Sequence, residues 1–299
     1  MHQKISVVIN TYNEEKNIER AIKSVAWADE ILVCDMRSED NTVEIAEKMG
    51  AKVIFCKRED YVEPVRNFAI TKAQGPWILI LDADEETPPS LDNRLKEITK
   101  KMKEMDYIRI PRKNLIFGKW MKASMWWPDL NIRFFKKGKV EWSDKIHRPP
   151  KVIGEGIDLP LDEKFAIIHH HYDSVSQFLE RMIKYTKIQA KELKEEEYNF
   201  DWKDLIKKPL GEFLSRFFAN RGFEDGLHGL GLSLLQAFSH LVVYLRVWEM
   251  EKFDQKEIDI SEAKSLRDES GREINWWFEH VSRSGVKGLF KKIKENFAK

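Results

Sequence analysis

Four acidic residues stand within five positions in the segment Asp82-Ala83-Asp84-Glu85-Glu86. They follow Trp77-Ile78-Leu79-Ile80-Leu81, an unbroken apolar run of the kind that forms a strand buried on both faces. In extended backbone, residues i and i+2 point the same way, so the carboxylates of Asp82 and Asp84 are expected to face one point. Two such carboxylates repel each other unless a cation lies between them. Their oxygens suit Mg²⁺ or Mn²⁺, metals that also bind substrate phosphates.

A purely structural role for these acids is the alternative. Carboxylates favour helix N-termini because they complement the helix dipole. Thr87 is already suited to cap the next helix, with Pro88 at its first position, and both aspartates precede Thr87. The order of these residues therefore favours a metal and phosphate site over capping.

Strands and helices alternate over the first hundred residues. Apolar strands are predicted at 5–9, 31–34, 53–56 and 77–81, separated by helices that begin near residues 18, 42 and 62. This alternation predicts an α/β fold with a mostly parallel sheet flanked by helices, in which ligands bind beyond the carboxyl ends of the strands. No glycine-rich phosphate loop follows the first strand, so neither a dinucleotide site nor a P-loop is expected.

The composition narrows the class of protein. The 299 residues allow one large domain or two, and 51 Lys plus Arg against 50 Asp plus Glu give no overall field that would attract nucleic acid. Cys34 and Cys56 lie in predicted strands and form no spacing motif, so we expect buried thiols in a reducing compartment. The N-terminus enters a strand almost at once, without a signal-peptide pattern, which favours a cytoplasmic location.

Three motifs at the strand ends resemble family 2 glycosyltransferases with the GT-A fold. They are the segment 5–14, ending in Thr11-Tyr12-Asn13-Glu14, the segment 34–42 around Asp35, and Asp82-Ala83-Asp84. Further segments resemble a subgroup that contains lipopolysaccharide-core glucosyltransferases, namely Arg133-Phe134-Phe135, Trp142, Ile146-His147 and Gly222-Phe223-Glu224-Asp225-Gly226. The resemblance implies a catalytic domain over 1–172, with a nucleotide-sugar-binding part at 1–105 and an acceptor part at 106–172. A helical extension would follow over 173–299.

The resemblance also implies roles for individual residues. The nucleotide-sugar-binding residues would be Thr11, Tyr12, Asn13, Glu14, Asp35, Arg66, Asp82, Ala83 and Asp84. Among them, Asp35 would hydrogen-bond the base, and Asp84 would bind the metal directly. Asp82 would contact the ribose or a metal-bound water. Arg66 would approach the diphosphate or ribose, with an ion pair on a helix surface as the structural alternative. His147 would be a third metal ligand, as a histidine is in some related enzymes, with a purely structural histidine as the alternative.

An inverting transferase needs a carboxylate that takes the proton of the acceptor hydroxyl. The candidates are Asp129, Asp144 and Glu141. Asp129 comes first because a Leu-x-x-Arg run follows it, like the run after the base of the family, although Pro128 replaces the usual glutamate before it. The predicted acceptor side consists of Trp120, Trp126, Trp127, Arg109 and Arg112. The tryptophans would form a platform for a sugar's apolar face, and core packing is the alternative.

Histidines and a change of composition mark the second half. His169 and His171 alternate along a predicted strand, so they share one face, either as a metal site or as a partly exposed strand end. From Ser174 a long amphipathic helix is predicted to about Glu197.

Two features of the C-terminal region bear on membranes. The stretch 227–245 has no charged residue, yet its glycines and polar residues make a membrane span unexpected. Basic and aromatic residues at 213–223 and 287–297 predict helices lying on an anionic membrane surface. Helix packing or a homodimer contact is the alternative.

Together with the acidic site, the resemblance implies a metal-dependent, inverting transfer of a sugar from a UDP- or GDP-linked donor to a hydroxyl of a cell-envelope glycan, lipid-linked or part of a lipopolysaccharide core. A polyprenyl-phosphate sugar synthase is the nearest alternative, with Arg109 and Arg112 binding its phosphate acceptor. A nucleotidyltransferase would usually carry a glycine-rich basic loop after the first strand, where Thr11-Tyr12-Asn13 stands. A non-catalytic sugar-nucleotide-binding or interaction protein is a third alternative, and the presence of both Asp82 and Asp84 argues against it.

Overall fold

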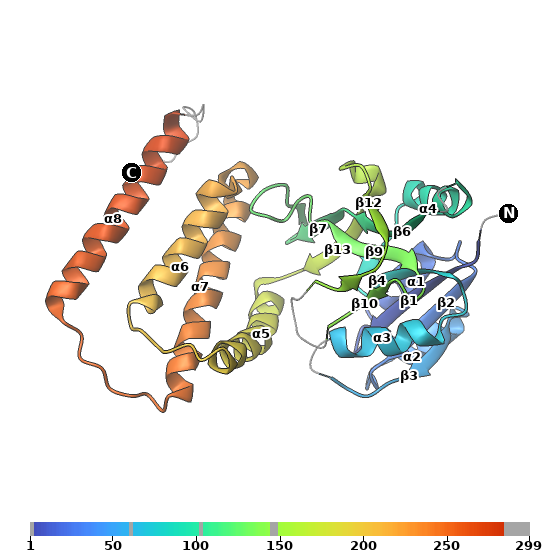
Figure 1. The fold of residues 1–299 in the computed structure, drawn as a ribbon, viewed down its shortest axis with the longest axis horizontal. Coiled ribbons are helices and arrows are strands. Elements are labelled where there is room, and N and C mark those ends of the chain that lie inside the picture. The colour runs from blue at the N-terminus through green and yellow to red at the C-terminus, as the bar shows by residue number, and fades with distance from the viewer. Residues whose placement is uncertain (1–2, 60–61, 102–103, 144–148, 284–299) are drawn as a thin grey trace. The chain divides into compact units, whose positions relative to one another are not determined.

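The computed structural model describes residues 3–59, 62–101, 104–143 and 149–283. The chain forms two compact units (Figure 1). The first contains Met1–Trp120 and Trp126–His171, and the second contains Met121–Met125 and Tyr172–Lys299. A short segment from the middle of the chain thus belongs to the C-terminal unit, which no sequence pattern indicated.

A mostly parallel sheet forms the centre of the first unit. Its strands are β1 (Ile5–Thr11), β2 (Glu30–Asp35), β3 (Lys52–Phe55), β4 (Trp77–Asp82), β6 (Met105–Ile110), β9 (Asn131–Lys136) and β12 (Glu155–Asp158). They lie in the order β12-β6-β9-β4-β1-β2-β3, and β9 runs antiparallel between β4 and β6. The predicted α/β class with a mostly parallel sheet is confirmed.

Smaller sheets complete this unit. One has the strand order β5-β13-β7-β8, formed by β5 (Glu85–Glu86), β13 (Ile167–Tyr172), β7 (Arg112–Ile116) and β8 (Lys119–Trp120). The other pairs β10 (Val140–Glu141) with β11 (Lys151–Val152). The strand β5 directly follows the acidic end of β4, and β13 pairs antiparallel with it. The histidines of β13 therefore lie beside the acidic segment.

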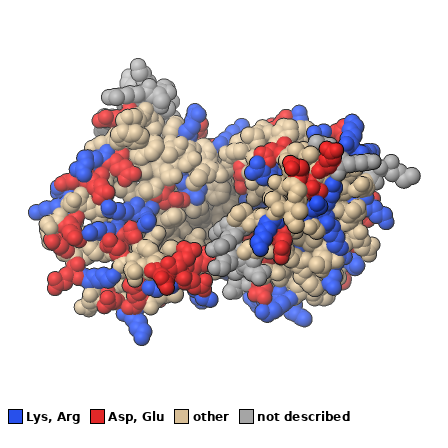
Figure 2. Space-filling model, in the orientation of Figure 1, with Lys and Arg blue, Asp and Glu red and all other residues tan. Residues whose placement is uncertain are grey.

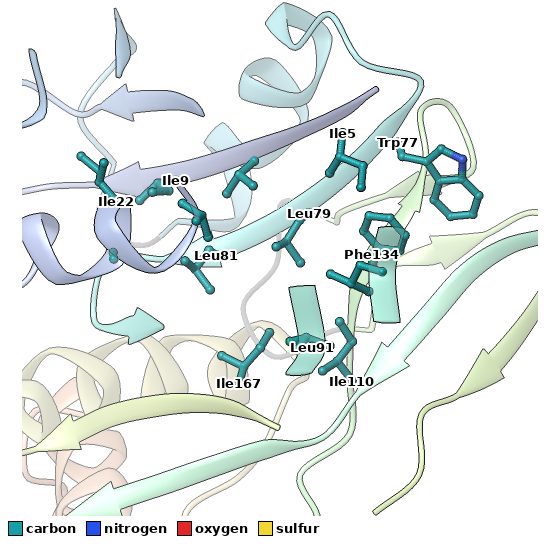
Figure 3. Packing of buried hydrophobic residues seen from close by; sticks show 14 of the residues in the cluster. Ile5, Ile9, Ile22, Trp77, Leu79, Leu81, Leu91, Ile110, Phe134 and Ile167 are labelled. Atoms are coloured by element: carbon teal, nitrogen blue, oxygen red, sulfur yellow. The ribbon is translucent and has the colours of Figure 1, made fainter. Parts of the chain in front are cut away.

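Helices cover both faces of the central sheet. Side chains from α1 (Ile18–Ser24), α2 (Thr42–Lys48) and α4 (Pro89–Lys101) pack in one cluster with Ile5, Ile9 and Leu79 (Figure 3). Side chains from α3 (Glu63–Lys72) pack in a second cluster with Val8 and Ile80. The apolar residues of β1 and β4 are buried on both faces, and each large one contributes about 1.5–3 kcal/mol of burial. This burial fixes where the strand ends lie.

The start of α4 differs from the prediction. The helix begins at Pro89 rather than Pro88, and Thr87 does not cap it. The hydroxyl of Thr87 instead lies 2.9 Å from the main-chain oxygen of Ser24 and 2.9 Å from Oδ1 of Asp92. Thr87 thus joins the end of α1 to the first turn of α4.

The second unit is helical, as predicted. Its helices are α5 (Val175–Glu195), α6 (Asp204–Leu214), α7 (Leu227–Met250) and α8 (Ile260–Arg283), with a π-helical turn at Ser215–Ala219 and a 3-10 turn at Gly222–Asp225. The side chain of Ser174 caps α5 by accepting a hydrogen bond from the Gln177 main-chain N–H, 3.2 Å away. Asp225 is buried, and its Oδ2 accepts hydrogen bonds from the main-chain N–H groups of Lys122 (3.0 Å) and Ala123 (2.8 Å). These bonds hold the segment 121–125 in this unit.

The predicted lipid-facing residues at 213–223 need a correction. Phe217, Phe218 and Phe223 are buried and pack with Leu214 and Val281, so they form a core. The downstream residues 287–297 lie outside the described residues. Among the described helices, α7 alone is long and apolar enough to cross a membrane, and 33% of its most apolar window is buried. Charges of both signs are interspersed over the visible face of each unit (Figure 2).

Candidate functional site

The polar ends of β1, β2 and β4 meet at the carboxyl edge of the central sheet. Asn10 of β1 lies opposite Asp82 of β4 and Cys34 of β2, and Thr11 lies opposite Asp35. Neighbouring strands are about 4.8 Å apart, so the two aspartates are separated by two spacings, about 10 Å. This edge is where α/β sheets bind their ligands.

Two buried side chains at this edge have polar atoms without a hydrogen-bond partner in the described part of the chain. They are Asn10, at both amide atoms, and Thr11, at its hydroxyl. Buried polar groups almost always have a partner, so these atoms indicate a place for a ligand or water. Sequence reasoning gave Asn10 no role, because its position in an apolar strand carries no further signal.

Asp82 lies between two arginines. Its Oδ1 is 2.8 Å from Arg66 and its Oδ2 is 2.8 Å from Arg133, and its main-chain N–H donates to Oε2 of Glu85 at 2.9 Å. Burial acts to raise the pKa of the Asp82 carboxyl, but Arg133 and Arg66 outweigh it and hold that pKa well below its usual range. Asp82 is therefore ionised at neutral pH. Arg66 was expected either to approach the donor or to form an ion pair on a helix surface. It forms an ion pair with Asp82, but the arginine is buried and does not lie on the surface.

Asp84 lies near a histidine. Ala83 and Asp84 form a turn between β4 and β5, so the extended geometry expected for residues 82–84 is wrong. The Asp84 carboxylate is buried, and its Oδ2 lies 3.5 Å from Nε2 of His169. Asp82 and Asp84 thus contact different partners, one arginines and the other an imidazole.

His169 and His171 lie on one face of β13, with ring centroids 4.4 Å apart. His169 is only 5% exposed, so the expectation of a partly exposed strand end is wrong for this residue. Its Nδ1 is 2.6 Å from Oδ1 of Asn114, a fully buried residue of β7. Trp126 packs edge to face with His171, with ring centroids 5.3 Å apart. A predicted acceptor-side tryptophan thus lies beside the histidines.

Asp129 is held by three donors. Its Oδ2 accepts hydrogen bonds from Nε of Arg112 (2.7 Å) and Nδ2 of Asn114 (2.8 Å), and its Oδ1 accepts one from Nδ2 of Asn131 (2.9 Å). Burial acts to raise the pKa of Asp129, but Arg112 and these hydrogen bonds lower it overall. The carboxylate is therefore ionised and fixed in orientation, two properties that suit a base, although its low pKa weakens its basicity.

Glu85 connects the two halves of this network. It is fully buried, and its Oε1 lies 2.7 Å from Arg133 and 3.2 Å from Arg112. One run of contacts therefore passes from Asp82 through two arginines and Glu85 to Asp129. Sequence reasoning gave Glu85 and Arg133 no separate role. The only available signals were the density of acids after β4 and the arginine in the run after Asp129.

The loop after β1 is tied to the loop after β2. The main-chain N–H of Asn13 donates to Oγ of Ser38 at 2.8 Å, and the N–H of Glu14 donates to Oγ1 of Thr42 at 2.8 Å. Asp35 is buried and accepts hydrogen bonds from Ser38, at Oδ1 from its N–H (2.8 Å) and at Oδ2 from its hydroxyl (2.6 Å). Hydrogen bonds among these residues therefore hold the two loops in fixed positions relative to each other.

A pocket of about 800 Å³ opens beside these loops. It is lined by Arg37, Phe55, Cys56, Lys57, Arg58, Glu59, Pro64, Val65 and Phe68. The guanidinium of Arg58 lies 4.5 Å over the ring of Tyr12, which connects the pocket to the end of β1. Two exposed phenylalanines, Phe55 and Phe68, give the pocket apolar walls among its cations. Such a lining suits a flat, polar ring system carrying negative charge.

The remaining predicted residues lie at different places. Trp120 and Trp127 pack edge to face, with centroids 5.2 Å apart. Arg109 forms an exposed, two-bond ion pair with Asp158, apart from the buried network. Glu141 is exposed on β10, opposite Lys151. The predicted base candidate Asp144 and the predicted metal ligand His147 lie outside the described residues.

A divalent cation fits the groups around Asp84. Among the described residues no three His, Cys, Asp or Glu side chains lie close enough to hold a metal. Asp84 and His169 nevertheless face each other at 3.5 Å, a separation that two ligands of one small cation can adopt. Mg²⁺ and similar ions take few protein ligands when substrate phosphates and waters complete the shell. The donor set therefore suits a metal bound together with a diphosphate.

A family model and full-length sequence relatives identify one family. The family described as "Glycosyl transferase family 2" matches residues 6–151. An uncharacterized glycosyltransferase of Rickettsia typhi is 31% identical over 258 residues, which cover 83% of this chain and 88% of that protein. One from Rickettsia bellii is 30% identical over 259 residues, covering 83% and 87%. A solved mannosyltransferase of Pyrobaculum calidifontis, in complex with GDP-Man and Mn²⁺, has a TM-score of 0.44 at 14% identity, covering 98% of this chain and 88% of that one.

Proposed function

The chain belongs to glycosyltransferase family 2, and on that premise we propose that it transfers a sugar, with inversion, from a nucleotide-diphosphate donor to a hydroxyl of a glycan. The observation that carries this proposal is the pairing of Asp84 with His169 beside the arginine-bound Asp82, at the carboxyl edge of the sheet. Family membership makes the nucleotidyltransferase and non-catalytic alternatives unnecessary.

The donor would span the edge from β2 to β4. Its base and ribose would lie near Tyr12 and Asp35, with the pocket around Arg58 next to them. The distance of about 10 Å between the ends of β2 and β4 suits a nucleoside joined to a diphosphate. The amide of Asn10, which has no partner among the described residues, lies between these two ends and would hydrogen-bond the donor.

Asp84 and His169 would hold a divalent cation, Mn²⁺ or Mg²⁺. Asp82 would not bind this cation directly, because both of its carboxylate oxygens contact arginines. The cation would neutralise charge that develops on the leaving diphosphate. The chain's own residues contribute the frame: Arg133 and Arg66 keep Asp82 ionised, and their buried position makes the site rigid. A preorganised charged site of this kind needs no rearrangement during reaction.

Asp129 would act as the base that removes the proton from the acceptor hydroxyl. It is joined through Asn114 to His169, so it lies in the same network as the proposed cation site. Glu141, the alternative in the described part of the chain, is exposed on a separate small sheet. The half-buried tryptophans Trp126 and Trp127 would provide apolar surface for the acceptor sugar.

A phosphate acceptor is less well supported than a hydroxyl. Arg112 is engaged by Asp129 and Glu85, and Arg109 by Asp158, so each predicted phosphate-binding arginine already has carboxylate partners. A phosphate would have to displace them. A hydroxyl acceptor needs only the carboxylate of Asp129.

We place the enzyme in the cytoplasm, in peripheral contact with an anionic membrane that carries a lipid-linked or lipopolysaccharide-core acceptor. The support is the exposed apolar stripe of α7, formed by Leu227, Leu234, Phe238 and Leu245. Their spacing of seven, four and seven residues puts them on one helix face. Helices with such an apolar face commonly lie in the membrane surface, with that face buried among the lipids.

A donor screen tests the proposal. The protein is heated with UDP- and GDP-linked sugars, with and without Mn²⁺, since ligands that bind only the native state raise its melting temperature. We expect one nucleotide class to stabilise the protein only when Mn²⁺ is present, and the same donor to be consumed when glycan acceptors are added. A protein that no nucleotide sugar stabilises, with or without metal, would refute the proposed donor.

A further inference from the structure

Asn114 occupies an unusual position in the network. It is fully buried in β7, and the structure gives its side chain three polar contacts. Its Nδ2 donates to the main-chain oxygen of Trp126 at 2.8 Å and to Oδ2 of Asp129 at 2.8 Å. Its Oδ1 lies 2.6 Å from Nδ1 of His169. One amide therefore touches both the proposed base and a proposed metal ligand.

The partners of Asn114 fix the orientation of its amide. A main-chain carbonyl and an ionised carboxylate surround one end, and both of them only accept hydrogen bonds. That end must be the NH₂ group, because the opposite orientation would bring an amide oxygen against two other oxygens. Oδ1 therefore faces the ring of His169 and acts as an acceptor.

The orientation of Asn114 in turn fixes the proton position on His169. Because Oδ1 accepts, Nδ1 of the histidine carries the hydrogen and donates it. In a neutral ring Nε2 then has a lone pair and no hydrogen. This lone pair faces Oδ2 of Asp84, 3.5 Å away. A nitrogen lone pair and a carboxylate repel each other when nothing lies between them. The same arrangement is favourable when both groups bind one cation.

From these contacts we infer that Asn114 is a positioning residue, which presents Nε2 of His169 to a cation beside Asp84 and holds the Asp129 carboxylate in its orientation. The inference rests on the proposed function. It adds that one buried amide aligns the metal side and the acceptor side of the site. Metal-binding histidines are commonly oriented in this way by a group on their other nitrogen, and losing such a group typically lowers metal affinity about 10- to 100-fold.

Two variants separate the contact of Asn114 with His169 from its contact with Asp129. Asn114→Leu is close in size and removes all three contacts, so His169 loses its partner at Nδ1 and Asp129 loses one of its three donors. Asn114→Asp keeps an oxygen acceptor for His169 but loses the donors to Asp129 and Trp126. The matched control is Asn67→Leu, since Asn67 makes two similar bonds to the main chain of Trp142, at 2.8 and 2.9 Å, without touching either residue.

Two readouts apply to all four proteins. The first is the tautomer of His169, from the imidazole nitrogen chemical shifts of protein labelled with ¹⁵N-histidine, assigned with His169→Gln. The second is Mn²⁺ affinity in the presence of UDP or GDP, from the electron paramagnetic resonance signal of free Mn²⁺. A structural residue would change neither readout when the variant is folded.

We expect wild type and Asn67→Leu to keep the Nδ1–H form of His169 and the same Mn²⁺ affinity. Asn114→Leu should lose the single tautomer and bind Mn²⁺ about 10- to 100-fold more weakly. Asn114→Asp should keep the tautomer and bind Mn²⁺ within about threefold of wild type, while its turnover falls because Asp129 has lost a donor.

Three results would overturn the inference. An Asn114→Leu protein with wild-type tautomer and Mn²⁺ affinity would leave the proposed function intact and refute the role of Asn114. Should that variant fail to fold, a loss of Mn²⁺ affinity in Asn114→Asp as large as that of His169→Gln would refute it. Absence of Mn²⁺ binding in wild type would refute both the inference and the proposed metal site.

Discussion

Replacing Arg133 with methionine should destabilise the protein strongly. Arg133 is 4% exposed and contacts both Asp82 and Glu85, the latter fully buried. Methionine preserves much of the apolar volume but leaves the buried carboxylate of Glu85 and the half-buried carboxylate of Asp82 with one cation fewer. Removing one partner of a buried ion pair costs about 3–5 kcal/mol. For a protein of this size each kcal/mol lowers the melting temperature by about 2–4 °C, so a decrease of about 6–20 °C is expected.

An arginine on the surface provides the control. Arg109 also forms a two-bond ion pair, with Asp158, but both side chains are more than 40% exposed. Exposed pairs contribute less than about 1 kcal/mol, because water and salt screen them. Arg109→Met should therefore lower the melting temperature by no more than about 4 °C.

The pH dependence provides a second check. In wild type the pKa of Asp82 is lower in the folded state than in the unfolded state, where it is about 3.9. Its contribution to stability is therefore fully present above that unfolded pKa and is lost as the pH falls through the folded pKa. In Arg133→Met that folded pKa rises, because burial then acts against one arginine fewer. The deficit of the variant should therefore be smaller at pH 4 than at pH 7. Thermal melts followed by circular dichroism measure both effects, and equal melting temperatures for Arg133→Met and Arg109→Met would refute the reasoning.

Three further predictions concern other parts of the chain. Burial raises the pKa of Asp92 to about 6, so stability associated with this group is lost as the pH rises through that value. Asp92→Asn should thus be more stable than wild type at pH 8, by at most about 3 kcal/mol, and equal at pH 4, and a pH-independent shift in thermal melts would contradict this. Asp129→Asn should lower turnover by about 10²- to 10⁴-fold while donor binding persists in thermal shifts, and wild-type turnover would exclude it as the base. The double variant Leu234→Glu, Phe238→Glu should cosediment less with anionic liposomes than the control Ile183→Glu, and equal binding would argue against membrane contact through α7.

The central sheet followed from local patterns, and so did the prediction of a candidate site at its edge. The apolar run 77–81 has no alternation, which identifies a strand buried on both faces, and its acidic end marks the edge where ligands bind. The buried strand and its acidic end are encoded by residues that are neighbours in the sequence, and they require no knowledge of distant contacts. A single chain therefore carries enough information to predict them.

The partners of the acids could not be predicted in the same way. Asp82 contacts Arg66, 16 residues away, and Arg133, 51 residues away, and both contacts depend on how strands and helices are placed. The turn at Ala83 and Asp84 also escaped prediction, because the pairing of β5 with β13 overrides the extended geometry of the preceding strand. His169 and Asn114 are 55 residues apart in the sequence, and the periodicity of apolar residues gives no information about contacts at that separation.

The proposed cation site is tested most directly by the position of manganese in a crystal grown with Mn²⁺ and UDP or GDP. Anomalous scattering locates the ion without assuming its ligands. We predict a peak bonded to a carboxylate oxygen of Asp84 and to Nε2 of His169, with the diphosphate completing the shell. A nucleotide-bound crystal in which the ion lies elsewhere, and in which Asp84 and His169 keep their 3.5 Å separation with nothing between them, would contradict it.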